Sequence, residues 1–160
     1  MDPETPSVAR SGSGGSVRTR VTRRIAADPT STALLLAGPT ALELWPGVRR
    51  VAEVAGRIVV ETELTPDRPV AASVTAQPPR RTLTAFVTTF AWAGPSLPDT
   101  RAELVLGYAP ISAGEIGTHA ALVLDSSFDG SDVDERRLAQ MARGFLDNLA
   151  TAAESRSRAA

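Results

Sequence analysis

The pattern of apolar positions near the C-terminal end has the period of an α-helix. From residue 131 to about residue 156, apolar side chains recur every three or four positions, and charged side chains lie on the opposite face. Ser131 or Asp132 is a suitable N-cap for this helix. The pattern predicts a long amphipathic helix with one face that needs a partner. The main residues of that face are Leu138, Met141, Phe145 and Leu149.

Most of the chain before this helix alternates between apolar and polar residues, as a strand with one buried face does. Segments rich in Pro, Gly and Asp separate the alternating stretches. Because the connections are mostly short, the strands should pair in antiparallel fashion. The predicted strands are 17–27, 48–54, 57–64, 70–76, 82–92, 101–109 and 116–124.

Two short helices are predicted after the first strand. Asp28 is a favoured N-cap and Pro29 is tolerated at the first helical position, so residues 28–37 should form the first of them. A Gly-Pro break then restarts a second helix over residues 40–45. A sheet with one solvated face and one face covered by a helix belongs to the α+β class.

The first 15 residues are rich in Pro, Gly and Ser and show no hydrophobic period, which predicts a disordered leader. Residues 16–160 should then form one domain, large enough to contain a cavity.

Composition excludes several functions. A net charge of −1 without a dense basic block argues against nucleic-acid binding, and the absence of Cys excludes disulfides and Cys-based metal sites. The loop from Asp125 to Gly130 begins like a calcium-binding loop, but Arg136 occupies the place of the required Glu. No cofactor and no metal are therefore expected. The apolar runs are too short to span a membrane and no signal pattern is present, so we expect a cytoplasmic protein without stable membrane insertion.

Three segments suggest a family. They are RIAADP from residue 24, ELWPGVRRV from residue 43 and LAQMARGFLDNLA from residue 138. In this order the chain resembles the helix-grip fold of the START-like, or SRPBCC, superfamily, in particular its bacterial polyketide cyclase/dehydrase and lipid-transport branch. The resemblance implies a curved sheet of about seven strands that grips the C-terminal helix. It also implies an apolar cavity between them for a lipid, a polyketide or a similar molecule.

The residues on the inner faces of the predicted elements are the candidate lining of such a cavity. Several are small for positions under a curved sheet, which permits an open space; alternatively the large aromatic and aliphatic side chains fill it as an ordinary core. The candidate lining residues are Trp45, Val60, Thr62, Val74, Thr84, Phe86, Thr88, Phe90, Trp92, Leu104, Leu106, Tyr108, Leu138, Met141, Phe145 and Leu149.

Catalytic chemistry is less well supported. By strand parity the only ionisable residue on the inner face is Tyr108, a weak candidate for an acid, whereas His119 points to the other face. Three functions stay open: binding or transport of a hydrophobic molecule, polyketide cyclisation or aromatisation in the same cavity, and non-catalytic regulation through protein interactions. The sequence leaves the oligomeric state open.

Gly144 is unusual in the middle of a helix, where glycine costs about 0.5–1 kcal/mol relative to alanine. We therefore predict that Gly144 permits a strand or loop to approach the helix closely beside Phe145.

Overall fold

The computed structural model describes residues 7–11, 16–37, 39–54, 57–65, 68–94, 97–112, 114–127 and 134–159. Its helices and strands follow the predicted order with small changes at their ends. The elements are β1 (Ser7–Ser11), β2 (Ser16–Ile25), α1 (Pro29–Leu34), the 3₁₀ helix η1 (Pro39–Leu44), β3 (Val48–Val54), β4 (Arg57–Thr65), β5 (Arg68–Ala76), β6 (Arg80–Arg81), β7 (Ala85–Gly94), β8 (Leu97–Ser112), β9 (Glu115–Ser127) and α2 (Asp134–Ala159).

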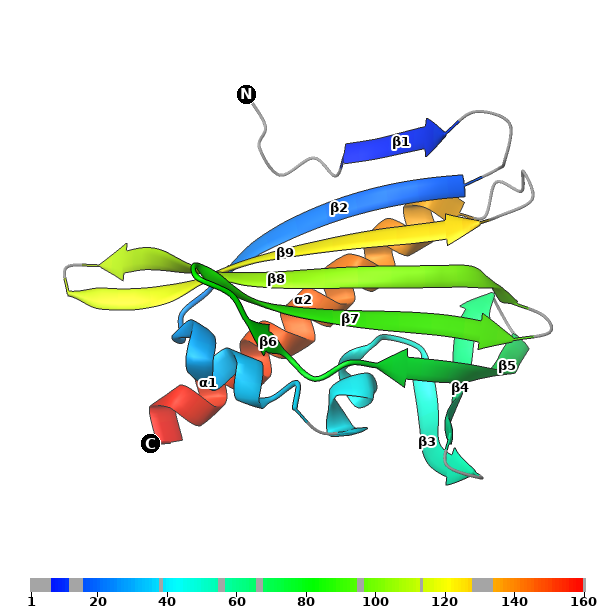
Figure 1. Ribbon diagram of the computed structural model, residues 1–160, viewed down its shortest axis with the longest axis horizontal. Helices are drawn as coiled ribbons and strands as arrows, with labels where there is room; N and C mark the ends of the chain where they lie inside the picture. Colours follow the sequence, from blue (N-terminus) through cyan, green and yellow to red (C-terminus); the bar gives the residue numbers. More distant parts are fainter. Residues whose placement is uncertain are drawn as a thin grey trace.

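The described strands form one antiparallel sheet, and α2 packs across one of its faces (Figure 1). The strand order is β1-β2-β9-β8-β7-β5-β4-β3, and the short β6 pairs with β7. In Figure 1, β3 and β4 run across the direction of β7, β8 and β9, so the sheet is strongly twisted. The α+β architecture predicted from the sequence is confirmed.

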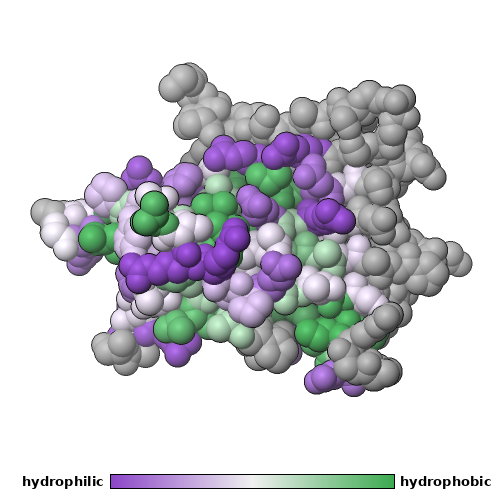
Figure 2. All heavy atoms as spheres, in the orientation of Figure 1, coloured by the Kyte–Doolittle hydropathy of each residue, from purple (hydrophilic) through white to green (hydrophobic). Residues whose placement is uncertain are grey.

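Side-chain alternation separates a buried face from a solvated face. Leu104 pairs with Leu122 on β9 and Thr88 on β7, and all three are buried on the face of the sheet against which α1 and α2 pack. The neighbouring Arg101 and Glu103 on β8 point away from the helix and are exposed. Figure 2 shows this outer face, where hydrophilic side chains, in purple, lie among pale and green ones. The period of two in the sequence thus identified the inner face correctly.

Several element boundaries differ from the predictions, among them the longer β8 (Leu97–Ser112) and β9 (Glu115–Ser127), and three further differences have a visible cause. Ser7–Ser11 form β1 and pair with β2, although no hydrophobic period marks them, because the pairing is made by the backbone; the rest of the expected leader lies outside the described residues. Residues 35–37 continue α1 as tight turns bonded three residues back rather than as α-helix. The strand expected from residue 82 begins at Ala85, because the Thr82 hydroxyl donates to the Ala85 carbonyl and accepts from the Ala85 N–H, both at 3.0 Å.

The predicted apolar face of α2 is buried. Leu138, Phe145 and Leu149 are at most 1% exposed, whereas Met141 is half-buried. Polar contacts at the flank of the helix fix it to the end of β2. Arg23 Nη1 donates to Asp147 Oδ1 over 2.6 Å, and the Ala26 N–H donates to Glu154 Oε2 over 2.9 Å.

Four aromatic side chains fill the space between the sheet and α2 near η1. Trp45 stacks on Phe145 of α2, with ring centroids 4.2 Å apart, and its edge meets Trp92 at 4.7 Å. Phe90 completes the cluster, with its centroid 5.5 Å from Trp45 and 5.8 Å from Phe145. Such stacked and edge-to-face pairs are the favoured arrangements of aromatic rings. This aromatic cluster ties η1, β7 and α2 together.

Gly144 allows the close approach predicted from the sequence. A Cβ atom built on Gly144 would overlap Cγ of Pro46, the residue that follows the aromatic Trp45. The loop after η1 therefore lies directly on the backbone of α2, beside Phe145, and this prediction is confirmed.

We predict that Gly144→Ala destabilises the protein by about 1–2 kcal/mol. Overpacking against the Pro46 ring costs about 1–3 kcal/mol, and the better helix propensity of alanine offsets up to about 1 kcal/mol of that. Urea unfolding of Gly144→Ala measures the change, with Arg143→Ala on the exposed face of α2 as control. Pro46→Gly should remove the clash, so the two substitutions should be less than additive. A Gly144→Ala protein more stable than the original would contradict the close approach.

Candidate ligand site

A hollow with a volume of about 560 Å³ opens between the layer formed by α1 and η1 and the end of the sheet formed by β3, β4 and β5. Its lining is mainly aliphatic, with two polar side chains. The residues that line it are Leu36, Ala37, Leu42, Val51, Ala52, Glu53, Ile58, Ala76, Gln77 and Pro78.

The turn after α1 contributes one wall of the hollow, and hydrogen bonds hold the start of this helix. Asp28 caps the helix, accepting from the Ser31 N–H at 3.2 Å and from the Ser31 hydroxyl at 2.5 Å. The buried hydroxyl of Thr118 on β9 donates to the Ala27 carbonyl over 2.7 Å. These hydrogen bonds fix where α1 leaves β2, and so where Leu36 reaches the hollow.

The wall contributed by η1 borders the aromatic cluster. Leu42 lines the hollow and is 1% exposed, and Trp45 follows one residue beyond the end of η1. Asn148 Nδ2 of α2 donates to the Leu44 carbonyl over 2.8 Å and holds η1 in place. On the sheet side Ala76 lies in the hollow and pairs with Phe90 on the same face. The hollow therefore continues the protein core at its edge.

The electrostatics of the hollow are simple. Glu53 and Gln77 are exposed at its rim, and none of the described residues that line it is basic. The indole Nε1 of Trp45 is buried in the neighbouring cluster without a hydrogen-bond partner. An unpaired buried donor costs about 1–3 kcal/mol, which makes this atom the least satisfied polar group beside the hollow.

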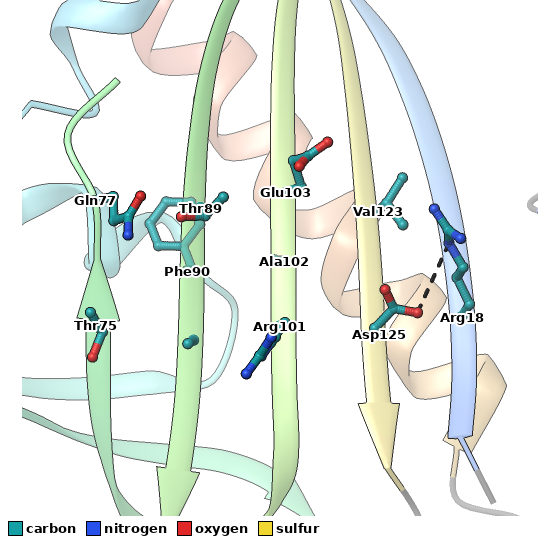
Figure 3. Close-up of a pocket in the computed structure, with 11 residues that line it drawn as sticks. Arg18, Thr75, Gln77, Thr89, Phe90, Arg101, Ala102, Glu103, Val123 and Asp125 are labelled. Atoms are coloured by element: carbon teal, nitrogen blue, oxygen red, sulfur yellow. Dashed lines mark ion pairs between the residues drawn. The ribbon is translucent and has the colours of Figure 1, made fainter. Parts of the chain in front are cut away.

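A second hollow, of about 430 Å³, lies on the outer face of the sheet (Figure 3). Its side chains come from neighbouring strands and alternate in charge: Arg18 on β2, Asp125 on β9 and Arg101 on β8 lie in one row. Arg18 Nε and Asp125 Oδ1 are 3.9 Å apart, and both side chains are more than half exposed. Exposed ion pairs contribute about 0–1 kcal/mol, so we interpret this hollow as part of the solvated face.

The predicted cavity residues whose side chains are described mostly form the packed core behind the first hollow, and none lines the hollow itself. Phe86 and Met141 are half-buried, and the side chains of Val60 and Thr62 lie outside the described residues. The buried residues of the set are Trp45, Val74, Thr88, Phe90, Trp92, Leu104, Leu106, Leu138, Phe145 and Leu149.

Two predicted placements are corrected. Thr84 is exposed, because it belongs to the turn that Thr82 organises before β7. Tyr108 is 51% exposed, because β8 and β9 extend beyond the part of the sheet that neighbouring strands and α2 cover. His119 is on the outer face, as its parity predicted, and is exposed.

The lining of the hollow was missed because it depends on how the short helices sit on β3 and β4. The sequence carried one sign of this lining, a cluster of leucines on both sides of the Gly-Pro break that includes Leu36 and Leu42. These leucines are too many to lie on one face of a single helix. Among the described residues, no three His, Cys, Asp or Glu side chains lie together as metal ligands would.

Solved structures of similar architecture place this arrangement in a known fold. The amino-acid sequence matches no protein-family model and no curated protein. A START superfamily protein from Mycobacterium smegmatis is 14% identical, with a TM-score of 0.58 over 87% of this chain and 95% of that chain. The chain has the START-like fold. The resemblance found in the sequence is therefore confirmed at the level of the fold.

Two further structures show the same START-like architecture. A protein from Thermus thermophilus is 14% identical, with a TM-score of 0.64 over 88% of this chain and 99% of that chain. A conserved protein from Geobacillus kaustophilus is 10% identical, with a TM-score of 0.60 over 86% of this chain and 95% of that chain. At these identities the likeness concerns the fold. No helix in the described parts of the chain is long and apolar enough to cross a membrane.

We predict that Asp28→Ala lowers the free energy of unfolding by about 1 kcal/mol at neutral pH, because the cap of α1 is lost. The hydrogen bond from the Ser31 hydroxyl has the largest effect on the pKa of Asp28 and, with the bond from the Ser31 N–H, lowers it below its ordinary value of 3.8. A carboxyl group with a lowered pKa in the folded state stabilises the fold above the unfolded pKa and loses that contribution as the pH falls through the folded value.

Urea unfolding of the original protein, Asp28→Ala and Asp28→Asn measures this contribution. Asparagine caps helices as well as aspartate does, so Asp28→Asn should stay near the original stability at neutral pH. The difference between the original protein and Asp28→Ala should shrink as the pH is lowered below 3.8. A difference that does not depend on pH would show that the charge of Asp28 makes no contribution.

Proposed function

We propose that this protein binds an uncharged hydrophobic small molecule in the hollow between α1, η1 and β3–β5. The observation that carries the proposal is the apolar character of this hollow at the edge of a filled core. Sites for small molecules generally have volumes of about 300–1,000 Å³ and an apolar lining with few polar groups. The hollow, at about 560 Å³, fits that description.

An uncharged ligand follows from the charges at the mouth. A carboxylate or phosphate on the ligand would meet Glu53 at the rim, and no described lining residue supplies a compensating cation. Burying an unpaired charge is far more costly than burying a neutral polar group. Neutral lipids and neutral polyketides therefore suit this hollow better than fatty acids do.

The filled interior directs the ligand to the edge of the core. The aromatic cluster occupies the space between the sheet and α2 that the sequence suggested for a cavity. Its residues would form the wall behind the ligand, so direct contact with the predicted lining set stays a prediction. A cytoplasmic location and transport of the ligand belong to the same proposal.

Cyclase or aromatase chemistry gains no support from the site. Such an enzyme needs an acid, a base or an oxyanion donor within reach of the bound substrate. Tyr108, the candidate acid, is half-exposed and lines neither hollow. Binding without turnover is accordingly the function that we propose.

We predict that Ala76→Leu lowers the affinity for the neutral fluorescent probe N-phenyl-1-naphthylamine by about tenfold, because the larger side chain fills part of the hollow. Titration of the probe, read by its own fluorescence and by quenching of Trp45 and Trp92 in the adjacent cluster, measures the change. The matched control is Ala91→Leu, which makes the same substitution one residue beyond Phe90 but on the outer face.

Equal affinity of the original protein and Ala76→Leu would show that the probe binds elsewhere. Complete absence of probe binding, with no lipid or polyketide retained from an extract in native mass spectrometry, would refute the proposed function.

A second prediction concerns ligand charge. A long-chain alcohol should displace the probe at lower concentration than the fatty acid of equal length, because only the acid brings a carboxylate towards Glu53. Glu53→Gln should reduce the ratio between the displacing concentrations of the acid and the alcohol by roughly threefold at low salt, because it removes the repulsion between two exposed carboxylates. Glu103→Gln, on the outer face, is the matched control. A stronger preference for the acid in the original protein would contradict an uncharged ligand.

A further inference from the structure

The large hydrophobic side chains that are exposed in the described part of the chain gather at one end of the molecule. They come from α1, from the turn between β6 and β7, and from the β8–β9 hairpin, and we call them together the apolar end. Its residues are Leu34, Leu83, Tyr108, Ile111 and Ile116. Leu83 is fully exposed and the other four are 44–59% exposed.

Strand pairing and packing bring these three segments together. Ala85, at the end of the turn that carries Leu83, pairs with Gly107 beside Tyr108. α1 packs against β8 and β9, and Thr118, the partner of Tyr108, bonds to the start of α1. In Figure 1 the β8–β9 hairpin projects at the left beyond this turn and α1. Hydrophobic side chains, green in Figure 2, appear there beside hydrophilic ones.

The tip of the β8–β9 hairpin extends beyond the strands that pair with it in the described part of the chain. β7 pairs with β8 only as far as Gly107, and β2 pairs with β9 only as far as Thr118. Tyr108 and Ile116 share one face of the overhang, and Ile111 lies on the other. Neither of the two hollows described above is lined by residues of the apolar end.

The charges around the apolar end are mainly positive. Exposed arginines lie on elements that adjoin it: Arg24 at the base of the hairpin, Arg80 and Arg81 on β6, which pairs with β7, and Arg156 and Arg158 in the last turn of α2, which packs against α1. Three carboxylates on the same elements accept hydrogen bonds from neutral groups and keep their negative charge, so the five arginines outnumber them. Asp28 accepts from Ser31, Glu115 accepts from the Ser112 hydroxyl over 3.0 Å, and Glu154 accepts from the Ala26 N–H.

We propose that the apolar end docks on the surface of a membrane that contains anionic lipids. Separate aliphatic side chains on a protrusion can enter the boundary between headgroups and acyl chains, and tyrosine favours that boundary. Arginines beside them are attracted to anionic headgroups by about 1 kcal/mol each. Docking of this kind is peripheral and needs no membrane-spanning segment.

A second copy of the chain fits this end less well. Pairing between the free edges of two hairpins would need backbone donors, and Pro110 in β8 has none. The positive charges would also face each other across a symmetric contact. A membrane surface satisfies both constraints, because it accepts side chains without a defined register and supplies negative charge.

Vesicle co-sedimentation of the full chain tests the proposal. The original protein should bind vesicles of phosphatidylcholine with phosphatidylglycerol, and bind vesicles of phosphatidylcholine alone at least about tenfold more weakly. The double variant Tyr108→Ser with Ile116→Ser should lose about tenfold in binding to the anionic vesicles, because two apolar anchors are removed. Val105→Ser, on the outer face of the same strand, should bind as the original does.

The charge contribution has its own matched pair. Arg80→Gln with Arg81→Gln should lower binding to anionic vesicles by about tenfold or more, whereas Arg18→Gln with Arg101→Gln, on the outer face, should change it little. Because every substituted side chain is exposed or half-buried, the melting temperature and the binding of N-phenyl-1-naphthylamine should stay unchanged. This separates a failure of docking from a failure of the proposed ligand site.

Two results would overturn the proposal. One is an original protein that stays in the supernatant with anionic vesicles, or a Tyr108 and Ile116 variant that binds them equally well. The other is a dimer in sedimentation velocity that becomes a monomer in that variant without any vesicle binding, which would assign the apolar end to a contact between copies.

Discussion

The stacking of Trp45 on Phe145 is the contact on which the arrangement of the rest depends. It joins the loop after η1 to the middle of α2, while the edges of Trp45 against Phe90 and Trp92 join both to β7. The approach is possible only because position 144 has no side chain to oppose Pro46. A filled centre follows directly, since four large rings occupy the region between helix and sheet that would otherwise be the deepest cavity.

The filled centre explains why the open space lies at the edge. β3 and β4 turn away from the rest of the sheet, and α1 and η1 cover only part of the inner face that this leaves. The part of the inner face that the short helices leave open is apolar, because the alternation of inward apolar and outward polar side chains continues there from the core. Ala76, which lines the hollow, pairs with the core residue Phe90. A site of this kind has mainly aliphatic side chains as its wall, with the aromatic cluster in the core behind them and short, hydrogen-bonded helices on one side.

The sequence predicted the faces of the strands and of α2 well, because a period of two or 3.6 is a local property. Leu104, Leu106 and Phe145 were placed correctly on this basis. Strand parity does not say how far neighbouring elements cover a face of the sheet. Tyr108 is therefore on the predicted inner face but lies beyond the elements that would bury it. Arg23 shares the inward parity of Val21 and Ile25, yet it reaches the flank of α2 and pairs with Asp147. Where coverage ends depends on tertiary packing, which no local pattern records.

The two proposals meet at α1. Its last residue, Leu34, belongs to the apolar end, and Leu36 and Ala37 immediately after it line the hollow. A lipid surface in contact with Leu34 would therefore lie only a few residues from the hollow, and a hydrophobic molecule leaving that surface would cross little water to reach it. The hydrogen bonds of Asp28 and Thr118 hold the start of α1, and tight turns together with the buried Leu36 side chain hold its end.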